Sequence, residues 1–133
     1  MGVEGLNVGA LRALPQDEPV VMVNLMKFRA RASDGSGTGW EAYLRYSKLT
    51  APMIKARGGT IIWAGEANTV AVGDPEADSW DYIALVYYPT RAAFLDMLTS
   101  RDYVERSDPV RTAACERHVI IATTQAYAKP SPA

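Results

Sequence analysis

The amino-acid sequence predicts one α+β domain in which a short N-terminal helix precedes the element order βαββαβ. Three observations carry this prediction. The chain has 133 residues, which is the length of a single domain. Four short runs rich in β-branched and aromatic residues are typical of strands. The segments between them have the apolar spacing and the end signals of helices.

The first part of the chain predicts a helix and then a buried strand. Apolar residues at helical spacing indicate a helix over residues 6–14, and Pro15 ends it. Residues 20–26 are short for a helix and rich in β-branched side chains, so we expect a buried strand. The polar segment 29–39 contains three of the glycines and is expected to be a loop.

The longest helix is predicted over residues 38–57. Thr38 and Glu41 have the spacing of a capping box, in which each side chain satisfies a backbone donor of the first turn. The glycine pair at 58–59 supplies the C-terminal stop, because glycine adopts left-handed angles at little cost. Pro52 lies inside this segment, so we expect it to kink or split the helix.

The second part of the chain predicts two strands, two helices and a final strand. We expect strands at 60–67 and 80–88, helices at 90–98 and 107–117, and a last strand at 118–127. The strand at 60–67 is expected to continue to residue 73 after a bend or bulge, before a turn at 74–78. Thr90, Ser100 and Ser107 are the expected N-caps, and Pro109 follows Ser107 at a first helical position.

This element order is the ferredoxin-like arrangement, whose antiparallel sheet carries helices on one face only. In the strand over 20–26, the aliphatic odd-numbered residues are expected to face the helices. The even-numbered residues, which include Asn24, are expected on the open face. Neither set is truly polar on any central strand, and a sheet that is apolar on both faces is covered on both faces. We therefore expect a homodimer in which two copies pack sheet to sheet as a dimeric α/β barrel.

Composition and charge bound the partners and the compartment. The domain is expected to span residues 1–127, followed by a disordered tail at 128–133. The net charge of −1 argues against binding to nucleic acid or to a membrane surface. Residues 1–5 lack the basic and apolar regions of a secretory signal. The single cysteine, Cys115, cannot form an internal disulfide, so we expect a cytoplasmic protein.

Few residues point to metal, cofactor or nucleophilic chemistry. One cysteine and one histidine make no ligand cluster, so we expect no metal and no cofactor. The segment 35–39 lacks the lysine and spacing of a phosphate-binding loop. We interpret Cys115 as a small buried helix residue, and His118 as a surface or edge histidine rather than a general base. No residue is assigned a catalytic role.

Several stretches together resemble the domain of unknown function 1330 family. They are PVVMVNLMKF at 19–28, WD at 80–81, YPTRAAF at 88–94, the M, S and Y at 97, 100 and 103, and RTAA at 111–114. The resemblance spans about residues 19–122, and Val110 stands where members often carry a histidine. It implies a dimeric α/β barrel without an assigned reaction. The wider superfamily includes cofactor-free oxygenases, haem-degrading enzymes, decarboxylases, isomerases and proteins that only bind.

Two polar residues are candidates for ligand contacts. Asn24 lies in an apolar strand, where an unpaired amide costs roughly 1–3 kcal/mol, so a neighbour or a ligand is expected to bond it. Arg111 is expected either to hold an anionic group or to pair with Asp81, Asp108 or a helix end. Arg91, beside the expected cap at residue 90, is interpreted as a solvated surface residue.

Three aromatic residues, Trp63, Tyr82 and Tyr46, complete the set of candidates. Each is expected to line a pocket between sheet and helices or to pack in the core. The first functional hypothesis is a small-molecule binding protein or cofactor-independent enzyme, whose ligand is a small apolar or aromatic compound. The alternative is a non-catalytic dimeric structural or regulatory module.

Overall fold

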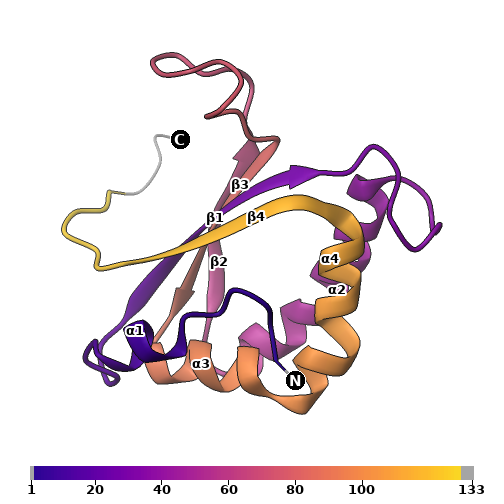
Figure 1. Ribbon diagram of the computed structural model, residues 1–133. Coiled ribbons are helices and arrows are strands. Elements are labelled where there is room, and N and C mark those ends of the chain that lie inside the picture. Colours follow the sequence, from indigo (N-terminus) through magenta and orange to yellow (C-terminus); the bar gives the residue numbers. More distant parts are fainter. Residues whose placement is uncertain (1, 130–133) are drawn as a thin grey trace.

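The computed structural model of the protein describes residues 2–129 and has the α+β class that the sequence predicts. The elements are α1 (Val8–Arg12), β1 (Val20–Phe28), α2 (Gly39–Ala56), β2 (Thr60–Glu66), β3 (Tyr82–Tyr88), α3 (Arg91–Thr99), the π-helical turn η1 (Tyr103–Ser107), α4 (Asp108–Ala114) and β4 (Cys115–Thr123). Figure 1 shows the loop between β2 and β3 projecting away from the helices.

The four strands form one antiparallel sheet in the order β2-β3-β1-β4. β1 lies between β3 and β4, and its Asn24 is in register with Ala84 on one side and Ile120 on the other. β2 is an edge strand that pairs only with β3, and most of its residues are exposed. The middle of β1 is therefore the most enclosed part of the sheet.

The face assignment that the sequence favours for β1 is wrong. Val20, Met22 and Met26 are buried beneath the helices, whereas Val23 and Leu25 are only half-buried on the opposite face. Both sets are apolar, so alternation alone carried no information about which set meets the helices. Flexible methionine side chains fill the irregular space between the sheet and the aromatic rings of the helices.

The outer face of the sheet is also apolar, as predicted. Its exposed or half-buried side chains are Val23, Leu25, Trp63, Ile83, Leu85, Val119 and Ile121. Trp63 and Ile121 remain 49% and 48% exposed. The Trp63 indole lies across Gly65, where an added Cβ would come within 2.7 Å of the ring. Within residues 2–129, no buried core cluster forms on this face.

Helix α2 begins as the sequence predicts. The Thr38 hydroxyl accepts from the Glu41 backbone N–H at 3.1 Å, and the Glu41 carboxylate accepts from the Thr38 N–H at 2.9 Å. This confirms the capping box. Pro52 lies inside α2 without splitting it. The helix ends before Gly58, whose φ of +77° is the left-handed conformation expected of a glycine stop.

The segment before β4 differs from the prediction. Residues 101–114 are continuously helical and include η1, so Ser107 has helical angles and makes no side-chain cap. The wide π turn places both Tyr103 and Ser107 in the core against α2. Ser100 does accept from the Tyr103 N–H at 3.2 Å, as its expected role as a cap requires. β4 begins at Cys115, three residues earlier than expected.

Two further predictions in the second half fail. Residues 68–73 are not a strand, because pairing with β3 stops at Glu66 and the chain leaves the sheet. The turn at 74–78 is present, with Asp74 accepting from the N–H groups of Glu76 and Ala77. The prediction that Arg91 is solvated is wrong, because this residue is buried and only 3% exposed.

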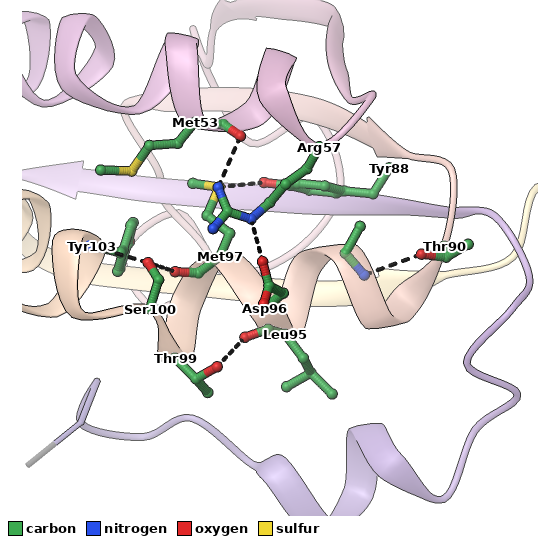
Figure 2. A network of polar contacts seen from close by, with 11 residues as sticks. Met53, Arg57, Tyr88, Thr90, Leu95, Asp96, Met97, Thr99, Ser100 and Tyr103 are labelled. Carbon is green, nitrogen blue, oxygen red and sulfur yellow. Dashed lines mark hydrogen bonds and ion pairs between the residues drawn. The ribbon is translucent and has the colours of Figure 1, made fainter.

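The polar contacts around helix α3, which Figure 2 shows, include one ion pair to the end of α2. Arg57 donates from Nε to Asp96 on α3 at 2.9 Å and from Nη1 to the Met53 carbonyl at 3.2 Å. Thr90 caps α3 by accepting from the Ala93 N–H at 3.1 Å, as predicted. Because Asp96 is 73% exposed, its ion pair with Arg57 contributes little, and the burial of Phe94, Met97 and Leu98 positions α3.

None of the helices that the structure describes is long and apolar enough to cross a membrane. Among residues 2–129, no group of three or more histidine, cysteine or acidic residues is placed to hold a metal ion. The tail predicted for 128–133 lies outside the described residues apart from 128 and 129, which form neither helix nor strand.

Candidate functional site

Two adjoining cavities lie between the sheet and the helices. The larger cavity, of about 280 Å³, is bounded by the N-terminal segment, α3, α4 and strands β1 and β4. The smaller cavity, of about 50 Å³, lies between the sheet and α2. The residues that line both are Met22, Phe94, Leu98, Tyr103, His118 and Ile120. Four of these six residues are apolar, so the shared wall is mainly apolar and has its polar groups at Tyr103 and His118.

The N-terminal segment, residues 3–14, covers the larger cavity. Leu6 and Leu11 pack against the core from this segment. Within the described part of the chain, its backbone-to-backbone hydrogen bonds are internal, the Gln16 side chain donates to the Leu11 and Leu14 carbonyls, and none of these bonds joins the segment to the sheet or to α3. This cover is therefore held in place by apolar contact and by the turn at residues 15–18 that follows it, which is hydrogen-bonded to α3.

A line of hydrogen bonds crosses the wall of the cavities from α4 to β1. Arg111 donates from Nε to Asp108 at 2.8 Å, and its Nη1 lies 3.3 Å from Nδ1 of His118. His118 Nε2 lies 2.9 Å from Oδ1 of Asn24, whose Nδ2 donates to the Met22 carbonyl at 3.2 Å. We call Asp108, Arg111, His118 and Asn24 the polar network.

The partners of His118 fix its protonation. Arginine can only donate, so Nδ1 must accept, and the ring hydrogen must lie on Nε2, where it is donated to Asn24. Burial, together with the positive charge of Arg111, lowers the pKa of His118 to about 3. At neutral pH His118 is an uncharged ring with both nitrogens engaged, and it can take up a proton only if Arg111 moves away.

A pair of phenols lies beside the polar network. The hydroxyls of Tyr46 on α2 and Tyr103 in η1 are 2.6 Å apart. Burial raises the pKa of Tyr103 to about 12 and also raises the pKa of Tyr46. Both phenols therefore keep their protons at neutral pH, so the pair holds two hydroxyl hydrogens and uses one between its members.

Three of the five predicted candidates meet at these cavities. Asn24 and Tyr46 line the smaller cavity, and Arg111 lines the larger one. Asn24 is bonded to His118 and Met22, and Arg111 to Asp108, which is one of the carboxylates that the sequence proposes for it.

The other two candidates lie elsewhere. Trp63 is on the outer face of the sheet, in register with Leu85. Tyr82 faces the helices but joins a cluster of rings with Phe28, Trp40 and Tyr43, at centroid distances of 5.3–6.3 Å from Tyr82. This cluster closes the end of the sheet near the start of α2, and Tyr82 lines neither cavity.

Sequence reasoning missed the central position of His118 and the role of Tyr103. His118 is paired with Met26 on β4, which is an edge strand as the interpretation allows, but it is half-buried and is not a surface residue. The error follows from starting the last strand at residue 118 rather than at Cys115. In a strand, residues 118, 120 and 122 point to the same face, and this alternation could have placed His118 with Ile120 and Ala122 on the core side.

Cys115 is buried, as predicted, but it begins β4 rather than lying in a helix. Burial raises the pKa of its thiol to about 11, so the group is a protonated thiol at neutral pH and a poor nucleophile.

The fold and the site together define the class of protein. A four-stranded antiparallel sheet with helices on one face matches the dimeric α/β barrel fold. One match to that fold is the hydroxynitrile lyase from Passiflora edulis, with a TM-score of 0.51 and 15% identity over 86% of this chain and 99% of that chain. At this identity the likeness concerns the fold alone.

The family follows from a sequence match that covers the middle and most of the second half of the chain. The family described as "Domain of unknown function (DUF1330)" matches residues 37–125, which is more than half of the chain, so the protein belongs to it. RPA0582, a protein of unknown function from Rhodopseudomonas palustris, has a TM-score of 0.82 and 29% identity over 97% of this chain and 98% of that chain. The structure of methylated RPA0582 has a TM-score of 0.81 and 30% identity over 98% of this chain and 97% of that chain. No curated protein matches the sequence.

Proposed function

We propose that this protein binds a small, mainly apolar molecule in the larger cavity. The observation that carries the proposal is an apolar space of about 280 Å³ with a preorganised polar network in its wall. Binding sites for small molecules are concave and mostly apolar, with a few converging polar groups. A dry cavity of about 150 Å³ holds benzene in another protein, so this one has room for a substituted ring.

The protonation of the polar network favours binding over proton transfer. A general base needs a free lone pair within reach of the substrate. Nδ1 of His118 is engaged by Arg111, and Nε2 carries the hydrogen that Asn24 accepts. The network therefore serves as a fixed hydrogen-bonding wall in the resting protein, and a catalytic role for it would require Arg111 to be displaced.

Binding can be tested by titrating the protein with toluene and other small ring compounds while methyl NMR signals are recorded. We expect saturable shifts for Leu6, Leu98 and Ile120, which surround the cavity. A variant that fills the space, Ala122→Phe, should lose these shifts. The control Ala77→Phe, in the exposed loop between β2 and β3, should keep them. If none of the compounds saturates the protein, the proposal is wrong.

We also propose that two copies associate through the outer face of the sheet. Supporting this is the row of apolar side chains on that face, where Trp63 and Ile121 are about half exposed. Contiguous exposed apolar surface of this kind marks an interaction site, and a two-fold dimer is the commonest way to cover it. The cytoplasmic location stays a prediction from the sequence.

Light scattering tests the association. We expect about 29 kDa, twice the 14.5 kDa of one chain. Ile121→Glu should shift the mass to one chain, whereas Leu44→Glu, at an exposed position on α2, should leave it unchanged. A wild-type protein that stays at one chain mass at micromolar concentration would rule out the dimer.

A further inference from the structure

The wall of the larger cavity also indicates the chemistry of the bound molecule. We infer that the polar group of the ligand is an uncharged hydrogen-bond acceptor, such as the carbonyl oxygen of an aromatic ketone, and not a carboxylate. This inference rests on the proposed binding function and deepens it. It follows from which hydrogen-bonding groups in the wall are already used, which are left over, and how the charges balance.

Two of the four network residues present no free hydrogen-bonding group to the larger cavity. Both ring nitrogens of His118 are engaged, one accepting and one donating. Asn24 uses its carbonyl oxygen for His118 and an amide hydrogen for the Met22 carbonyl, and it lines only the smaller cavity. The recognition of a ligand in the larger cavity must therefore come from other groups.

The groups left over beside the polar network, on Arg111 and the phenol pair, are donors. Arg111 lines the larger cavity and uses Nε and Nη1 for Asp108 and His118. Within residues 2–129, its Nη2 group has no hydrogen-bond partner, which leaves two N–H donors. The Tyr46–Tyr103 pair has one hydroxyl hydrogen that their mutual bond does not use, and Tyr103 lines the larger cavity. An acceptor on the ligand satisfies these donors.

The charges argue against an anion as that acceptor. The positive charge of Arg111 is already neutralised by Asp108, with both side chains largely buried, at 12% and 15% exposed. The low pKa of its ring keeps His118 uncharged, and Glu4 adds a negative charge to the wall of the same cavity. A carboxylate would bring a second negative charge to an already paired arginine, so no net positive charge in the wall would offset the hydration that it loses.

A matched set of probes separates these alternatives on the intact protein. Acetophenone carries a neutral acceptor, benzoate has the same number of non-hydrogen atoms but is anionic, and toluene has no acceptor. We expect acetophenone to bind about five- to tenfold more tightly than toluene, which corresponds to one hydrogen bond of about 1 kcal/mol. We expect benzoate to bind more weakly than acetophenone in the same titration at pH 7.

The outcomes distinguish this inference from the function on which it rests. Benzoate binding as tightly as acetophenone, or toluene matching acetophenone, would overturn the inference while leaving the cavity a binding site. Failure of every probe to bind would instead overturn the proposed function.

A variant connects the preference to Arg111. Arg111→Lys keeps the charge beside Asp108 but removes the Nη2 donors, so the ratio of acetophenone affinity to toluene affinity should fall to about one. Arg101→Lys is the matched control, because Arg101 is 87% exposed and pairs with Glu105 away from the cavity. If Arg111→Lys keeps the full preference, Arg111 is not the donor. Should that variant fold poorly, the three-probe comparison on the wild-type protein still decides.

Discussion

Two arginines, Arg91 and Arg111, both lie in helices and are largely buried, but they differ in their hydrogen-bond partners. Arg91 is the first residue of α3 and Arg111 lies within α4, and both are removed from solvent to a large degree. Arg91 donates to the Pro15 carbonyl at 3.1 Å, to Glu18 at 3.3 Å and to Thr124 at 2.7 Å. Arg111 bonds Asp108 and His118 and faces the larger cavity.

The difference lies in what the bonds of each arginine join. Arg91 links the turn before β1, the start of α3 and the chain after β4, so it holds together segments far apart in the sequence. It lines neither of the two cavities between sheet and helices. Arg111 pairs within its own helix and with the neighbouring strand, and it retains donors toward the cavity. We conclude that the bonds of Arg91 connect segments of the fold, whereas Arg111 lies at the proposed binding site.

The largest effect on the free energy of unfolding is expected when Arg91 is replaced. Arg91→Met should lower the free energy of unfolding by about 3 kcal/mol, because it removes three hydrogen bonds of about 1 kcal/mol each that join distant segments. Urea unfolding measures this change. Arg101→Met should change the free energy by less than about 0.5 kcal/mol, since exposed ion pairs contribute little. Equal effects of the two substitutions would remove the contrast between Arg91 and a surface arginine.

A smaller effect is expected on the cavity side, at Asn24. Asn24→Ala should lower the free energy of unfolding by about 2 kcal/mol, because the N–H of His118 loses its acceptor in a half-buried position. Asn68→Ala, in the exposed loop between β2 and β3, is the control. The nitrogen NMR shifts of the His118 ring should report a single tautomer in the wild type and a mixture of tautomers in this variant. An unchanged tautomer would show that Asn24 does not fix the ring.

The smallest effect concerns pH. The pKa of His118 is about 3 in the folded protein and near 6.5 when unfolded, so the unfolded chain binds more protons between these values. Stability should therefore fall as the pH drops below 6.5, with a slope approaching about 1.4 kcal/mol per pH unit from this residue. His118→Asn should lose this contribution in urea unfolding between pH 6.5 and 5. Identical slopes for both proteins would mean that His118 is not held neutral.

Much of the fold could be predicted because local signals and tertiary structure agree there. The capping box at Thr38 and Glu41, the cap at Thr90 and the strand that begins at Val20 are set by neighbouring residues, and all are confirmed. The apolar pattern on both faces of the sheet was also visible, but the face that meets the helices was not. That choice depends on how side chains fill the space between layers.

The site was harder to predict because its bonds join distant segments. Asn24 and Arg111 stood out as polar residues in apolar surroundings, and both take part in the network. Their link, His118, depended on where β4 begins, and a helix that runs directly into a strand gives no local boundary signal. Arg91 looked like an ordinary residue of a first helical turn, since its partners lie 73 and 33 residues away.

The central claim is that a small molecule occupies the larger cavity, and intermolecular NOEs test it most directly. With methyl-labelled protein and acetophenone, we expect NOEs from the aromatic protons of the probe to the methyl groups of Leu6, Leu98 and Ile120. NOEs to Ile83 and Ile121 on the outer face instead, or none at saturating probe, would contradict the account.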